Sequence, residues 1–87
     1  MPHVTVRLFA ALRELAGSSR VEADGATVGE VIEALSARYG QRFAGVAAVG
    51  SAVVDGERAD PTTPLSAGQE VALLPPVSGG FRQGNRP

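Results

Sequence analysis

Gly79 and Gly80 are the residues of this chain whose type and spacing most clearly suggest chemistry. A dense apolar run ends at Pro75-Pro76, and the side-chain-free pair follows shortly after. Proline has a fixed φ and no N–H, so two of them end a strand and direct the chain outward. Two glycines then form a thread narrow enough to enter a slot in another protein. We therefore expect residues 75–80, which can extend at most about 20 Å, to enter a partner's active site.

The other chemically capable residues form no recognisable catalytic or metal-binding motif. His3 is the only histidine, and without a nucleophile motif beside it we expect an exposed residue at a strand end. Asp55, Glu57 and Asp60 lack the spacing of a calcium loop and are interpreted as a solvated turn. The absence of cysteine excludes disulfides, cysteine nucleophiles and thiolate metal sites. The sequence therefore predicts no catalysis by the chain alone, no bound metal and no cofactor of its own.

The composition predicts one soluble domain. The chain has 87 residues, of which 44% are hydrophobic and 20% charged. Its apolar runs are far shorter than a membrane span, and with no signal peptide or cysteine at hand we expect a cytoplasmic protein without membrane contact. The basic residues are all arginines and form no stripe, so nucleic-acid binding is not predicted.

The first half of the chain has clear strand and helix patterns. Side chains of residues 3–9 alternate between two faces, with the apolar Val4, Val6 and Leu8 on one of them. This period of two predicts a half-buried strand. Phe9 falls on the polar face, and two interpretations stay open: it packs under the next helix, or it anchors a partner. A short helix is expected over 10–16, ended by Gly17, and a second strand over 20–23.

Thr27 opens the main predicted helix. Thr27 and Glu30 have the spacing of a capping box, in which Glu30 would accept from the Thr27 N–H. An apolar stripe at helical spacing continues to Tyr39, and Gly40 ends the helix. The stripe consists of Val28, Val31, Ile32, Leu35 and Tyr39.

The second half is predicted to be mainly strand and loop. We expect a connector over 41–45 with Phe43 folded onto the core, then a strand over 46–54 with a bend or hairpin at Gly50-Ser51. Residues 58–63 are expected to be irregular, and Leu65 to plug the core. The last strand covers 70–74, with Leu74 facing outward beside the exit.

This element order predicts an α+β fold of the β-grasp type. The sheet would be mixed, with about four to five strands, the first and last in its centre, and one main helix packed on one face. Residues 1–74 would form the domain, 75–80 a flexible diglycine tail, and 81–87 an extension that follows it.

Four segments resemble the MoaD/ThiS family of ubiquitin-like sulfur carriers, and within it the small subunit of molybdopterin synthase. The resemblance covers residues 3–80. The segments that carry it are Leu8-Phe9-Ala10-Ala11-Leu12-Arg13-Glu14-Leu15-Ala16-Gly17, Thr27-Val28, Pro64-Leu65-Ser66-Ala67-Gly68-Gln69-Glu70-Val71 and Leu73-Leu74-Pro75-Pro76-Val77-Ser78-Gly79-Gly80.

The resemblance implies that Gly80 and Gly79 form the reactive end of a carrier. A ubiquitin-activating-enzyme-like adenylyltransferase would use ATP to adenylate the Gly80 carboxylate, and a sulfur donor protein would convert it to a thiocarboxylate. The tail would then deliver sulfur to the large subunit of molybdopterin synthase, making this chain the carrier subunit of a sulfurtransferase complex. The expected partner-binding residues are Phe9, Leu74, Pro75, Pro76, Val77 and Ser78.

One feature departs from the family pattern. Gly80 is amide-bonded to Phe81, whereas the family's glycine is normally terminal, and an amide cannot be adenylated as a carboxylate can. We expect a precursor that a deubiquitinase-like metalloprotease cleaves between Gly80 and Phe81. Three other functions stay open: a sulfur carrier for thiamin thiazole, cysteine or a secondary metabolite, a ubiquitin-like protein modifier, and a non-catalytic interaction module.

Overall fold

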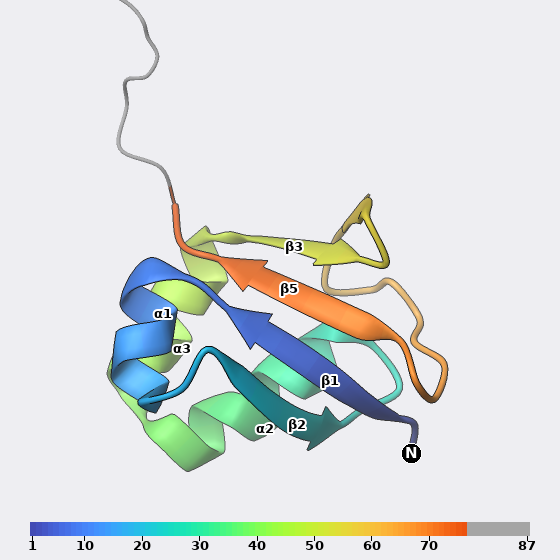
Figure 1. Cartoon of the computed structure of the whole chain (residues 1–87), viewed down its shortest axis with the longest axis horizontal. Coiled ribbons are helices and arrows are strands. Elements are labelled where there is room, and N and C mark those ends of the chain that lie inside the picture. Colours follow the sequence, from blue (N-terminus) through green and yellow to red (C-terminus); the bar gives the residue numbers. More distant parts are fainter. Residues whose placement is uncertain (77–87) are drawn as a thin grey trace, which may run out of the picture.

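The fold is a five-stranded mixed sheet covered on one face by helices, as predicted. The computed structural model describes residues 1–76, and Figure 1 shows the arrangement. The elements in chain order are β1 (His3–Leu8), α1 (Ala10–Ala16), β2 (Arg20–Asp24), α2 (Val28–Tyr39), α3 (Gln41–Val49), β3 (Ser51–Val54), β4 (Glu57–Ala59) and β5 (Glu70–Leu74). In this part of the chain, no helix has the length and hydropathy needed to cross a bilayer.

The first and last strands lie in the middle of the sheet. The strand order is β2-β1-β5-β3-β4. β1 and β5 are parallel, with Val6 opposite Val71, and the other three pairings are antiparallel. This confirms the prediction that the two most apolar strands are central. Because β1 and β5 run in the same direction, β5 ends beside the start of α1, and the tail leaves the domain there.

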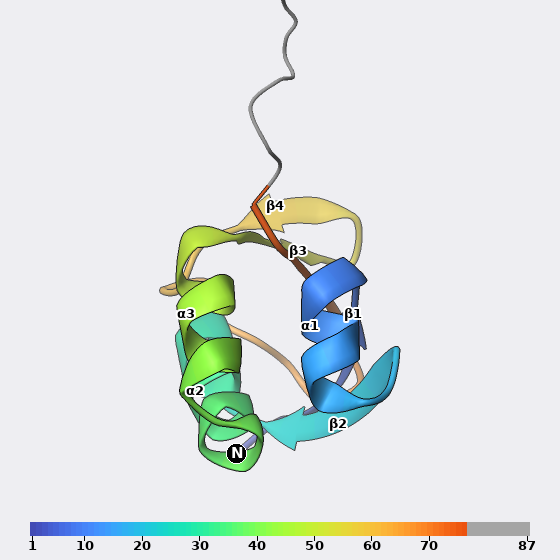
Figure 2. The same cartoon turned by 90° about the vertical axis from the view of Figure 1, so that its left-hand side faces the viewer.

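The core lies between the sheet and the helices. Figure 2 shows α2 and α3 on the same side of the sheet. The inward side chains of the two central strands are nearly inaccessible, Val6 and Val71 at 0% relative exposure. Leu12 of α1 is equally buried, and Leu65 fills the core from the loop before β5, as expected. The largest buried side chain is Phe43.

Helix α2 begins at the predicted cap with one difference. The Glu30 N–H donates to Thr27 Oγ1 at 3.2 Å, as a capping box requires. The Glu30 carboxylate, however, accepts from the N–H of Ala26 at 2.8 Å and not from that of Thr27. The Val28 and Gly29 N–H groups donate to the carbonyls of Thr63 and Pro61. The loop before β5 therefore satisfies backbone donors that the first turn of a helix leaves free.

The predicted connector and the first part of the strand predicted over 46–54 are wrong, because residues 41–49 form helix α3, whereas residues 51–54 form the strand β3. Gly40 has φ 101°, so the chain leaves α2 there and starts a new helix without an intervening loop. Phe43 and Ala47, four residues apart, face the core together. A short apolar run fits a strand or a helix equally well, and here the helix buries Phe43 where the connector was expected to place it.

The hairpin lies not at Gly50-Ser51 but in the acidic segment that starts at Asp55, which the sequence predicts to be a turn. Gly50-Ser51 joins α3 to β3, and the hairpin turn is at Asp55-Gly56, where φ is 48° and 86°. Part of the segment predicted to be irregular forms the edge strand β4, which pairs with β3 through Val53 and Arg58. Successive positive φ values are typical of the tight turns that join two antiparallel strands.

Candidate functional site

The candidate site begins where β5 ends. Leu74 is the last residue of β5, and Pro75 and Pro76 lead the chain away from the sheet. Pro75 is half-buried and Pro76 is exposed. The expected functional residues Val77, Ser78, Gly79, Gly80 and Phe81 lie outside the described residues. What the structure supplies is therefore the platform from which the tail starts.

Gly50 packs against the backbone of Leu74 and Pro75, the residues at which the tail starts. A Cβ atom at this position would lie 2.1 Å from the Leu74 carbonyl oxygen and 3.3 Å from Pro75 Cα. Ser51 pairs with Leu74 in the last rung of the β3–β5 ladder. The junction between α3 and β3 thus packs directly on the backbone at which the tail starts, and only glycine leaves room for that backbone.

Phe9 lies beside this exit. It is the N-cap of α1 with extended backbone (φ −126°, ψ 148°), so it continues β1 by one residue. The parallel register pairs Leu8 with Leu73, and Phe9 and Leu74 are the residues that follow this pair along the two chains. Its relative exposure is 41%, so Phe9 is not packed away under α1. The interpretation of Phe9 as a partner anchor stays a prediction.

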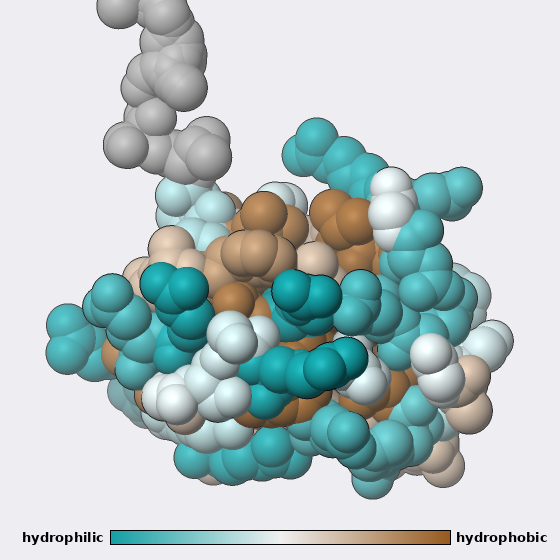
Figure 3. Space-filling model, in the orientation of Figure 1, coloured by the Kyte–Doolittle hydropathy of each residue, from teal (hydrophilic) through white to brown (hydrophobic). Residues whose placement is uncertain are grey.

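Four apolar residues form a patch on the outer face of the sheet, the face opposite the helices. Ala72 and Val53 lie on neighbouring strands, paired with each other, and are half-buried. Figure 3 shows apolar atoms over β3 and β5, with hydrophilic atoms around them. We call Phe9, Val53, Ala72 and Leu74 the apolar patch. It adjoins the tail base, so a protein that receives the tail would meet this patch first.

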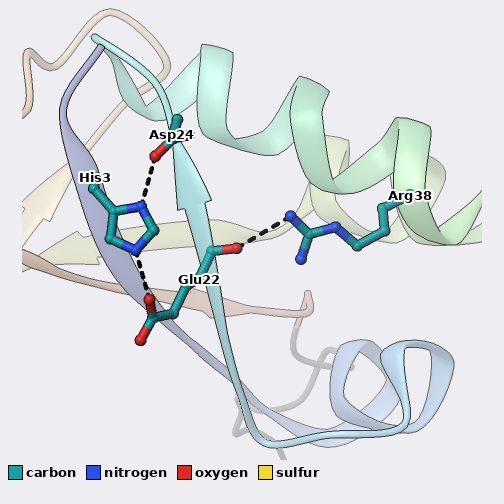
Figure 4. Close-up of polar contacts among 4 residues, drawn as sticks. All are labelled: His3, Glu22, Asp24 and Arg38. Atoms are coloured by element: carbon teal, nitrogen blue, oxygen red, sulfur yellow. Dashed lines mark hydrogen bonds and ion pairs between the residues drawn. The ribbon is translucent and has the colours of Figure 1, made fainter.

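His3 takes part in a polar cluster at the far end of the same face. Its Nδ1 lies 2.6 Å from Asp24 Oδ1 and its Nε2 2.5 Å from Glu22 Oε1 (Figure 4). Hydrogen bonds to Glu22 and then to Asp24 raise the pKa of His3 above its usual value of 6.5. With both ring nitrogens facing carboxylates, the protonated ring can donate twice. The predicted exposed strand-end position is correct, but the sequence pattern did not reveal its partners.

The acidic turn residues have structural roles. Asp60 accepts from the Thr62 hydroxyl at 2.6 Å and from the Thr62 N–H at 2.8 Å. These hydrogen bonds lower the pKa of Asp60. Asp55 accepts from the Glu70 N–H and the Gln69 side chain, which fastens the hairpin to the start of β5. Among residues 1–76, no three His, Asp or Glu side chains gather as metal ligands would.

A family comparison identifies the chain. The model of the ThiS family matches residues 6–80. The chain belongs to the ThiS family. This match covers most of the domain and ends at Gly80, so the residues from Phe81 onward lie outside it. Members of this family are ubiquitin-like sulfur carriers and modifiers with MoaD-like structural neighbours.

Known relatives agree with the ThiS assignment. Small archaeal modifier protein 1 of Haloferax volcanii is 40% identical over 84 residues, covering 85% of this chain and 97% of that protein. Its crystal structure superposes with a TM-score of 0.73 over 90% of this chain and 99% of that chain, at 35% identity. A putative molybdopterin converting factor subunit 1 from Pyrococcus furiosus gives a TM-score of 0.76 at 28% identity, covering 88% of this chain and 100% of that chain.

A third ThiS-like structure comes from a complex. A chain in the Amycolatopsis orientalis BexX/CysO complex is 28% identical, with a TM-score of 0.74 over 88% of this chain and 99% of that chain. That relative is thus known in a complex of two proteins.

The sequence identified only part of this platform. Leu74, Pro75 and Pro76 lie at the exit, and Phe9 follows the neighbouring strand, while their contact with a partner stays a prediction. Val53, Ala72 and Gly50 were missed as site residues. The signal for Gly50 was present, because a glycine among apolar residues marks a possible close backbone approach. Val53 could have been found only from the β3–β5 register, which the wrong strand boundaries concealed.

Proposed function

We propose that this protein is the sulfur carrier of a molybdopterin synthase-type complex and that Gly80 is its reactive terminus. The observation that carries the proposal is the ThiS match, which runs through the fold and stops at Gly80. The likeness to a putative molybdopterin converting factor subunit supports the molybdenum cofactor branch. Phe9, Leu74, Pro75, Pro76, Val77 and Ser78 would contact the partner, with Val53 and Ala72 beside them.

The proposed chemistry takes place in partner enzymes. An adenylyltransferase related to ubiquitin-activating enzymes would bind ATP, and a Gly80 carboxylate oxygen would attack its α-phosphorus, releasing pyrophosphate. The terminal sulfur of a persulfide on the sulfur donor protein would then attack the acyl carbon, so that AMP leaves and an acyl disulfide forms. A thiol would attack the donor-side sulfur of this S–S bond, which leaves the thiocarboxylate on Gly80 and a disulfide between the thiol and the donor. This chain supplies a terminus that backbone-only glycines allow into a narrow site, while the partner supplies orientation and electrostatics.

The bond between Gly80 and Phe81 must be cut before this chemistry can start. A peptide carbonyl has no free carboxylate oxygen to attack ATP. We therefore include a maturation step in the proposal, hydrolysis of the Gly80–Phe81 bond by a deubiquitinase-like metalloprotease. Intact-mass analysis of the protein from its native cells tests this step: a species ending at Gly80 is expected, and finding only the uncut chain would reject it.

A second candidate function is protein modification, favoured by the 40% identity to a small archaeal modifier protein. The same adenylated Gly80 would then be attacked by a lysine amine of a target protein, with AMP leaving and an isopeptide bond forming. The two functions differ in the species formed. A ladder of larger conjugates on an immunoblot would support modification.

The acceptor experiment distinguishes the branches. The thiocarboxylated chain ending at Gly80 is incubated with a large molybdopterin synthase subunit and its pterin precursor. Dithiolene formation supports the proposal, and the Gly80→Ala variant, which should fold normally, is the control that should lose it. Sulfur transfer to a thiazole or cysteine synthase, with none to the pterin, would instead assign the carrier to another pathway.

A further inference from the structure

Three arginines and two residues of the apolar patch share one rung of the sheet. The pairings place Arg20 opposite Arg7, Arg7 beside Ala72, and Ala72 opposite Val53. Arg58 continues this rung on the edge strand β4, opposite Val53. Since neighbouring strands are about 4.8 Å apart, the rung is about 19 Å long. The outer face thus carries a row in which an apolar centre has arginines at both ends.

The arginine arrangement is not explained by the fold itself. Arg7 and Arg20 lie directly opposite each other, and like charges in this position destabilise a strand pair. Arg7 has Glu70 at 3.6 Å. In residues 1–76 the remaining ion pairs are the two of His3, so neither Arg20 nor Arg58 has an acidic partner there. Arg20 thus faces Arg7 without an ion pair of its own to offset the repulsion, and this uncompensated charge points to an external partner.

The rung lies next to the tail exit. Two positions further toward the tail come Leu74 and its partner Ser51, followed by Pro75. A protein that receives the tail and covers the apolar patch must therefore also cover this row. The opposite end of the face carries Glu22, Asp24 and Glu70, which would repel a polyanion such as RNA. The charge pattern fits a protein surface with an apolar depression flanked by carboxylates.

We propose that Arg20 and Arg7 on one side of the patch, and Arg58 on the other, bind acidic side chains of the tail-receiving adenylyltransferase. This inference rests on the proposed function, because it assigns a contact surface to that partner. The ion pairs between these arginines and the acidic side chains of the adenylyltransferase would accelerate association and fix the orientation in which the tail enters. Arg20 is the best probe, since its side chain is exposed and makes no ion pair within the described residues.

The test compares Arg20→Glu with Arg42→Glu in the chain ending at Gly80, which keeps every residue of the described fold. Both variants change the net charge equally, but Arg42 lies in α3, on the other side of the molecule's sheet. The adenylyltransferase encoded in the same genome is used, and kcat/KM for Gly80 adenylation is measured at low and high salt. Thermal unfolding checks that both variants are folded, and Arg20→Glu should not be less stable because it removes the repulsion from Arg7.

The expected result is a decrease of kcat/KM of about tenfold or more for Arg20→Glu at low salt, which becomes smaller as salt screens the charges. Arg42→Glu should stay within about twofold of the parent chain. Equal effects of the two variants would overturn the arginine proposal while leaving the carrier function intact. Absence of adenylation in the parent chain would overturn both. Binding of a labelled RNA that is lost in Arg20→Glu would replace the protein partner by a nucleic acid.

Discussion

A Cβ atom on Gly50 would lie 2.1 Å from the carbonyl oxygen of Leu74, so these two residues meet backbone to backbone. Gly50 is the first residue after α3, and Leu74 is the last residue of β5. The contact therefore links the end of the second large helix to the start of the tail. It sets the position of the tail base more tightly than strand pairing alone.

Gly50→Ala is expected to move the tail base and destabilise the domain by roughly 1–3 kcal/mol, the usual cost of overpacking. Chemical denaturation measures the stability, and amide chemical shifts of Ser51 and Leu74 report the displacement. Gly45→Ala is the matched control in α3, because its Cβ would meet no atom within 4 Å. A Gly50→Ala variant with unchanged stability and unchanged shifts at Leu74 would contradict the contact.

Leu74→Glu is expected to weaken binding to the adenylyltransferase by at least about tenfold, or ~1.4 kcal/mol. The reason is that Leu74 is the patch residue directly before the tail, and a carboxylate there would have to be desolvated on docking. Isothermal titration measures the affinity. Ala37→Glu, on the exposed side of α2, should leave it unchanged. Equal affinities for both variants would remove Leu74 from the interface.

His3 is expected to make stability depend on pH. Because its folded-state pKa is raised, its contribution is fully present below about pH 6.5, the unfolded value, and is lost as the pH rises through the folded pKa. The melting temperature of the natural chain should therefore fall between pH 6 and pH 9 by more than that of His3→Gln. Parallel pH profiles of the two proteins would show that the cluster with Glu22 and Asp24 contributes nothing.

Phe43→Ala is expected to cost about 3–5 kcal/mol, as large aromatic deletions in a core do. The Phe43 side chain is fully buried between α3 and the rest of the core, in contact with Tyr39. Urea denaturation measures the change, with Phe9→Ala as the comparison, because Phe9 is 41% exposed and should cost far less. Similar losses for the two variants would contradict the α3 packing.

The sequence predicted the parts of the fold that local patterns specify. The alternation of apolar and polar residues predicted β1, and a capping residue with an apolar stripe predicted α2. Two prolines predicted the end of β5. The segment after Gly40 could not be assigned, because its apolar run fits both periods and only packing of Phe43 and Ala47 against the core decides for a helix.

The candidate site also has one part that local sequence patterns specify and one part that depends on packing between distant segments. Its linear part, from Leu74 to Pro76, is visible in the sequence as a strand followed by prolines. The part built by pairing is not. That Val53 and Ala72 join the patch, that Arg20 lies opposite Arg7, and that Gly50 touches Leu74 all depend on registers and packing between distant segments. A period-two pattern tells which face a residue occupies but not which residue lies next to it.

We propose above that Gly80 carries sulfur once its carboxylate is free. The most direct measurement is the intact mass of the chain ending at Gly80 after incubation with ATP, the adenylyltransferase and a sulfur donor, with the chain extending through Pro87 as the control. We predict that the shorter chain gains the mass of one oxygen exchanged for one sulfur and that the longer chain stays unchanged. An unchanged shorter chain, in the presence of an adenylyltransferase active on its own carrier, would rule out sulfur transfer to Gly80.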